Sequence, residues 1–154
     1  MTADQTRFVH EAIKAGASGA GFQKEGSCWR SYGPEAILVI EPQRSQYGPL
    51  YFLNFGAYVR SLGDIKKPRE LDWHVRARLS SVLSAAEVKP AESLLDFNLS
   101  MDDQDRHRAL VEVIRERVVP FLGRCATLES IFAMHAAGDL KRMLVKRTLT
   151  DLQN

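Results

Sequence analysis

The sequence has little of what most catalytic and metal sites are built from. Its 154 residues include only two cysteines and four histidines. Cys28 and Cys125 are far apart and neither belongs to a CxxC pair, which excludes a disulfide framework and a zinc or redox motif. The histidines show no HExxH spacing, and Ser45 lacks a GxSxG context, although distant residues can still assemble a triad in space. We predict reduced thiols, no metal and no cofactor, and we favour binding over catalysis.

The chain also lacks an excess of charge of one sign and a long apolar run. Lysine and arginine number 21 against 19 aspartates and glutamates, which gives a net charge of +2. No global field therefore attracts nucleic acid or an anionic membrane. No stretch approaches the roughly 18 apolar residues of a membrane span, and the N-terminus lacks the pattern of a signal peptide. We expect a cytoplasmic protein without membrane contact, in which nucleic-acid binding would need local features.

The first 60 residues predict a helix followed by strands. Thr2 and Gln5 fit a capping box, and apolar residues follow at helical spacing until Gly16. The stretch from Phe22 predicts two short strands around a turn at residues 25–26. Apolar runs at residues 36–40 and 50–59 predict two longer strands. In the last strand, the residues expected to face the core are Tyr51, Leu53, Phe55, Ala57 and Val59.

The second half of the chain is predicted to be mainly helical. Residues 73–83 are ambiguous, although the alternation of Val75, Ala77 and Leu79 with His74, Arg76 and Arg78 favours a strand. Residues 100–103 cap a helix that Pro120 ends or kinks, residues 127–138 form a shorter helix, and Asp139 begins a last one. The whole chain, residues 1–154, is expected to be a single α+β domain. Its antiparallel sheet would have four to five strands, with the N-terminal and C-terminal helices on one face.

Two charged clusters have structural explanations. Asp102, Asp103, Asp105 and His107 suggest a metal site, but acidic residues in the first turn of a helix are favoured by the helix dipole alone. The predicted last helix carries a basic stripe that could contact phosphates. The stripe consists of Lys141, Arg142, Lys146 and Arg147. Such a stripe is more often a solvated helix face, so we expect no metal and do not expect nucleic acid as the partner.

The strongest candidate for a binding surface lies on the predicted sheet. The polar stretch EPQRSQYG, residues 41–48, interrupts two apolar runs and predicts a hairpin connection that also forms the rim of a surface. Arginines, amides and aromatics of this kind are enriched in protein recognition sites. An ordinary solvated sheet face would explain the same pattern. The candidate residues are Gln43, Arg44, Ser45, Tyr47, Asn54, Arg76 and Arg78, with Trp29 and Arg30 nearby.

Three segments of the chain resemble one protein family. They are QRSQYGPLYFLNFG at residues 43–56, WHVRARLSSVL at residues 73–83 and PFLGRCATLESIF at residues 120–132. With Gly21-Phe22 near the start and the N-x-G pattern at Asn54, they resemble the bacterial family called domain of unknown function 4304. The resemblance extends from about Thr6 to Phe132.

The resemblance implies a small bacterial domain without an established activity. Such domains are often encoded beside secreted toxins and act as immunity proteins that occlude the toxin, an analogy at the level of class. The resulting hypothesis is a non-enzymatic domain whose partner is a protein, such as a toxin. The alternative is a phosphate-binding or nucleic-acid-processing protein that uses Asn54, Arg76 and Arg78. That alternative requires the three side chains to converge on a pocket.

Overall fold

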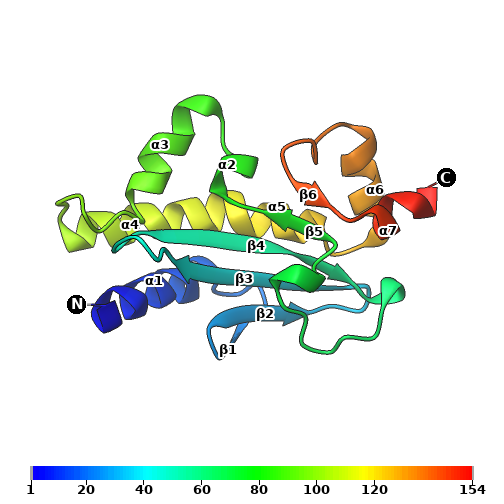
Figure 1. The fold of residues 1–154 in the computed structure, drawn as a ribbon, viewed down its shortest axis with the longest axis horizontal. Coiled ribbons are helices and arrows are strands. Elements are labelled where there is room, and N and C mark those ends of the chain that lie inside the picture. The colour runs from blue at the N-terminus through cyan, green and yellow to red at the C-terminus, as the bar shows by residue number, and fades with distance from the viewer. Residues whose placement is uncertain (1, 154) are drawn as a thin grey trace.

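A six-stranded antiparallel sheet organises the computed structural model, which describes residues 2–153 (Figure 1). The strands follow one another in chain order across the sheet. They are β1 (Gln23–Glu25), β2 (Cys28–Tyr32), β3 (Ala36–Arg44), β4 (Tyr51–Val59), β5 (Val75–Ala77) and β6 (Leu144–Val145). The α+β class is confirmed, with one strand more than the four to five expected.

Helices cover one face of this sheet. They are α1 (Thr2–Gly16), α2 (Leu79–Val82), α3 (Ala85–Ser93), α4 (Asp103–Val113), α5 (Val119–Arg124), α6 (Leu128–Ala136) and α7 (Arg147–Thr150). In Figure 1, α4 and α5 run behind the sheet. All five residues of β4 predicted to face the core are buried there, against Ile13 of α1 and Ile114. The side chain of Thr2, on which the predicted capping box depends, lies outside the described residues.

The hairpin between β3 and β4 is longer than the sequence predicted. β3 continues through Arg44, which pairs with Tyr51, and Glu41 pairs with Asn54. The first half of EPQRSQYG is therefore strand, and only residues 45–50 form the connection. Proline has no N–H for strand pairing, but β3 continues past Pro42 because the residues on either side of it pair with β4.

Pro120 does not end the long helix. Residues Ile114–Val118 form a π-helical turn, in which the Val119 N–H donates to the Ile114 carbonyl five residues earlier. This wider turn comes directly before Pro120, whose ring would clash with a carbonyl of a regular helix and which has no N–H to donate. α5 therefore continues to Arg124.

The predicted last helix from Asp139 is wrong. Residues 139–143 form turns, Leu144 and Val145 pair with β5, and only the four residues of α7 are α-helical after them. The leucine spacing is helical, but pairing with the edge of β5 satisfies the backbone instead. The proposed basic stripe is thereby divided among a turn, a strand end and α7.

Residues 73–83 contain both of the structures that the sequence left open. Residues 75–77 form β5, with Val75 and Ala77 buried on the helix side, and α2 begins at Leu79. The alternation predicted for a strand is therefore correct for the first half only. Arg76 and Arg78 do lie on the same side, as the alternation predicted, because both line one pocket.

The second face of the sheet is covered by residues 60–74, which we call the covering segment. Trp73 packs there in a cluster with Ile37, Val39 and Tyr58. The Trp73 indole N–H donates to the Pro68 carbonyl at 3.4 Å, and the Tyr58 hydroxyl accepts from the Ile65 N–H at 3.1 Å. The segment leaves this face much less open than the sequence suggested. Among residues 2–153, no helix is long and apolar enough to cross a membrane.

Candidate functional site

A pocket of about 290 Å³ opens where the covering segment meets β4, β5, α2 and β6. We call it the arginine pocket. Its lining combines guanidinium groups, hydroxyls and a carboxylate with a few apolar side chains. The lining residues are Asn54, Glu70, Trp73, Arg76, Ala77, Arg78, Ser80, Ser81, Arg142 and Leu144.

Arg76 and Glu70 form the ion pair of the pocket. Arg76 lies at the centre of β5, and its Nη2 donates to Glu70 Oε1 at 2.7 Å. Each side chain is about a quarter exposed, so solvent screens the pair only in part. The Arg76 Nε atom is buried and has no hydrogen-bond partner among the described residues. One donor of this guanidinium is thus left unsatisfied inside the protein.

Asn54 connects Arg78 to the same network. It is 2% exposed, and its Oδ1 accepts from Arg78 Nε at 2.9 Å. Its amide group donates to Gln43 Oε1 at 2.8 Å and more weakly to Glu70 Oε2 at 3.4 Å. The Arg78 guanidinium also lies over the Phe52 ring, 4.5 Å from its centroid. These contacts orient Arg78 without neutralising its charge.

Arg142 and Leu144 complete the pocket and were not predicted as site residues. Arg142 donates to the Leu83 carbonyl at 3.0 Å, and Leu144 pairs with Arg76 across the strands while staying 63% exposed. Both lie in the segment predicted as helix, so their position depended on a strand that the sequence did not indicate. Glu70 was missed because its loop position carries no periodic signal.

The arginine pocket carries an excess of positive charge. It holds three arginines and one glutamate, and that glutamate is already bonded to Arg76. Among the described residues, Arg78 and Arg142 bond only to neutral acceptors. Arg78 and Arg142 are exposed and Arg76 is half-buried. A concave surface lined by guanidinium groups attracts anions, and guanidinium geometry suits carboxylate and phosphate.

Glu41 introduces a second carboxylate beside this network. It pairs with Asn54 across the strands. Burial and the charge of Glu70 raise the pKa of Glu41, while Arg30 acts in the opposite direction. The raised pKa of Glu41 means that burial and the charge of Glu70 make its ionised form less favourable.

The remaining predicted residues do not reach the arginine pocket. Arg30 is 8% exposed and donates to Glu25 and to the Pro68 carbonyl. Trp29 lies on the opposite side of the sheet, where it contacts His10. In the β3–β4 connection, the buried Ser45 accepts from the N–H of the exposed Tyr47, and Arg44 at the end of β3 is also exposed. Of the nine candidates, the structure brings together Gln43, Asn54, Arg76 and Arg78.

The acidic cluster at the start of α4 has a structural role. Asp102 is the N-cap residue of α4 and accepts from the backbone N–H groups of Gln104 and Asp105. Within residues 2–153 no group of three or more potential metal ligands is placed to hold an ion. The cluster therefore stabilises the helix terminus, as the dipole argument indicated.

Replacing Asn54 with alanine is expected to lower the free energy of unfolding by about 2 kcal/mol, because Glu70 and Arg78 lose a buried partner. Gln43→Ala is the matched control. It removes an exposed group from the same network and is expected to change stability by less than about 0.5 kcal/mol. Urea denaturation of both variants measures the difference. Equal midpoints would contradict the role given to Asn54.

The fold and its pocket define a class of protein: an α+β domain in which an antiparallel sheet, backed by helices, carries an arginine-lined pocket on its other face. The chain belongs to the family described as Domain of unknown function (DUF4304), whose model matches residues 14–124. The match contains the Gly21-Phe22 start, the N-x-G strand and Pro120–Leu122, and it is shorter at both ends than the resemblance indicated. No curated protein and no solved structure matches the chain.

Proposed function

We propose that this chain is a non-enzymatic binding domain that takes an acidic group of a protein partner into the arginine pocket. The observation that carries the proposal is the presence of two arginines, Arg78 and Arg142, that bond only to neutral acceptors in a concave site. A guanidinium group stays protonated at neutral pH and only donates hydrogen bonds. Such a lining is suited to holding an anion rather than to moving a proton.

The apolar surroundings of the pocket favour a protein partner over a free ion. Leu144 lines the pocket and is 63% exposed, and Leu71, next to Glu70 in the chain, is 73% exposed. Exposed leucines beside arginines form the mixed surface that protein partners cover. The exposed Tyr47 of the β3–β4 connection and the exposed Arg44 at the end of β3 could extend this contact. In this proposal the partner is a bacterial toxin that the chain blocks as an immunity protein in the cytoplasm.

The second candidate is a phosphate-bearing ligand, including nucleic acid. The geometric condition of this alternative is met, because Asn54, Arg76 and Arg78 line one pocket together with the hydroxyl-bearing Ser80 and Ser81. The small net charge of the chain argues against extended contact with nucleic acid.

Affinity capture from the lysate of the natural host tests both candidates. We expect one protein to co-purify with the tagged chain in near-stoichiometric amount. Arg78→Glu is expected to weaken that complex at least tenfold, because it places a negative charge where the anionic group binds. The matched control is Arg108→Glu, since Arg108 is exposed on α4 away from the pocket.

Calorimetric titration separates the outcomes. Capture of nucleic acid would support the phosphate-binding candidate instead. The same conclusion would follow if inorganic phosphate released heat on binding the wild type and released none with Arg78→Glu. Equal capture of one protein by the wild type and by Arg78→Glu would disprove the arginine pocket as the binding surface.

A further inference from the structure

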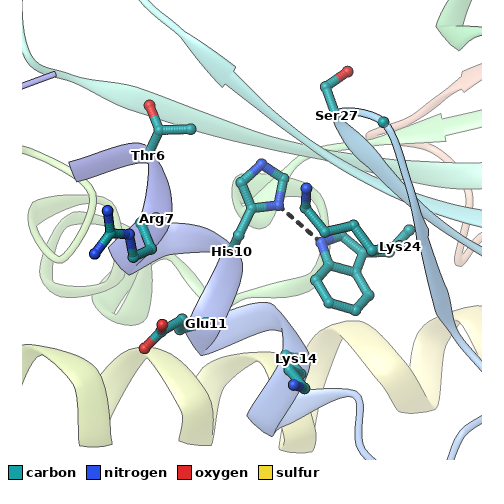
Figure 2. A pocket seen from close by; sticks show the side chains of 9 residues that line it. Thr6, Arg7, His10, Glu11, Lys14, Lys24 and Ser27 are labelled. Carbon is teal, nitrogen blue, oxygen red and sulfur yellow. Dashed lines mark hydrogen bonds between the residues drawn. The ribbon is translucent and has the colours of Figure 1, made fainter. Parts of the chain in front are cut away.

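A second pocket lies on the helix side of the sheet, between α1 and the β1–β2 hairpin (Figure 2). We call it the His10 pocket. It encloses about 540 Å³, a volume typical of sites for small organic ligands. Trp29 is the one large apolar side chain in its lining, and four of the other lining residues are charged: Arg7, Glu11, Lys14 and Lys24. An aromatic ring and charged groups in one pocket suit a ligand that combines a flat body with a charge.

The protonation state of His10 is fixed by its contact with Trp29. The Trp29 indole N–H donates to His10 Nδ1 at 3.0 Å, so a neutral imidazole carries its proton on Nε2. Burial, with a further contribution from Lys24, lowers the pKa of His10, which keeps the ring neutral at pH 7. Figure 2 shows the second ring nitrogen directed away from the bond to Trp29. His10 thus offers the pocket a neutral N–H donor.

The charged residues around His10 are mainly cationic. Arg7, Lys14 and Lys24 line the pocket, and Glu11 is the one acidic residue in the lining. Within the described part of the chain, Lys14 and Lys24 form no ion pair, and Arg7 reaches Asp4 only at 4.0 Å. Figure 2 places the Lys24 side chain beside His10. A positive charge and a neutral donor therefore lie side by side next to the Trp29 indole ring.

From this arrangement we infer that the His10 pocket binds a small organic anion with a flat, apolar body. Its carboxylate or phosphate group would interact with the Lys24 ammonium group and the His10 N–H, and its body would lie against the Trp29 ring. This site shares no lining residue with the arginine pocket. The inference is therefore independent of the proposed function.

Tryptophan fluorescence provides a direct test, because the chain has only two tryptophans. Trp29 lines the His10 pocket, whereas Trp73 is buried under the covering segment on the other face and gives a constant background. The wild-type chain is titrated with benzoate and with phenyl phosphate. We expect a saturable change in emission for at least one of them, with a Kd of about 1 mM or lower.

Three comparisons make the outcome decisive. Benzyl alcohol has the apolar body without the charge, inorganic phosphate has the charge without the body, and both are expected to bind at least tenfold more weakly. Lys24→Gln is expected to weaken binding of the anion tenfold or more, whereas Lys89→Gln, an exposed lysine on α3, leaves it unchanged. The difference between benzoate and phenyl phosphate shows which anionic group the site prefers.

Several results would overturn the inference. They are the lack of a saturable change with either anion up to about 10 mM, equal binding of benzyl alcohol, equal binding of inorganic phosphate, and undiminished binding by Lys24→Gln. Because Lys24 is exposed at the β1–β2 hairpin, its replacement is expected to leave the fold intact, which an unchanged urea midpoint verifies.

Discussion

Replacing Gly56 with alanine is expected to lower the free energy of unfolding by about 4 kcal/mol or more, or to prevent folding. Gly56 lies in the centre of β4, between Val39 of β3 and Arg76 of β5. A Cβ atom at this position would collide with the Val75 carbonyl oxygen and would lie 2.8 Å from Cε3 of the Trp73 ring. The collision involves backbone, so a rotamer change cannot relieve it. Overpacking that separates two paired strands belongs to the most destabilising class of substitutions.

Gly123→Ala is the matched control for this experiment. Gly123 lies in α5, and a Cβ atom there meets nothing within 4 Å. Alanine is the better helix former, so this variant is expected to gain up to about 1 kcal/mol. Urea denaturation followed by circular dichroism compares both variants with the wild type. An unchanged unfolding midpoint for Gly56→Ala would contradict the close approach of Val75 and Trp73 to Gly56.

The stability of the protein is expected to fall by about 3 kcal/mol through the titration of His74 as the pH drops from 6.5 to 4. His74 is buried, and its Nδ1 accepts from the Val59 N–H at 2.9 Å. Burial, with a contribution from Lys146, lowers the pKa of His74 from 6.5 to about 4, while Asp72 acts in the opposite direction. Between these two values, the unfolded chain binds a proton at His74 that the folded chain does not. The contribution of His74 to the free energy of unfolding is therefore complete above pH 6.5 and is lost as the pH falls toward 4.

His74→Asn isolates this contribution from other titrations. Asparagine retains an acceptor for the Val59 N–H and does not titrate. Glu41, whose pKa is raised by burial, changes stability in the opposite direction as it ionises, so the wild-type curve alone is a sum. The unfolding free energy is measured by urea titration between about pH 7.5 and 4.5 for both chains. Parallel curves would show that His74 is not buried as a neutral ring.

The strands of the first half could be predicted because each carries a local signal, either an alternation or a continuous apolar run. The five core-facing residues of β4 follow directly from period two, and Arg76 and Arg78 were placed on one side by the same pattern. The site was recognisable for the same reason: Asn54 is a polar residue in an otherwise apolar strand, and it became the centre of the network.

The other half of the site depended on contacts that no local pattern encodes. Leucines at residues 140, 144, 149 and 152 have helical spacing, but β5 offers a free edge, and pairing with it makes Leu144 a strand residue. The covering segment has no periodicity, and it is held through tertiary contacts of Pro68 and Trp73. Glu70 and Arg142 therefore reach the pocket through tertiary structure alone, and the recognition face expected to be open is largely closed.

The residues matched by the family model do not include the whole lining of either pocket. Residues 14–124 contain the network of Asn54, Arg76 and Arg78, but Arg142 and Leu144 follow after them, and His10 comes before. A fragment trimmed to the family boundaries would keep the deep parts of both sites and lose one wall of each. The family match therefore does not cover all the residues that would set the ligand preference of either pocket. Relatives that diverge in their terminal segments are expected to present the same inner groups to different molecules.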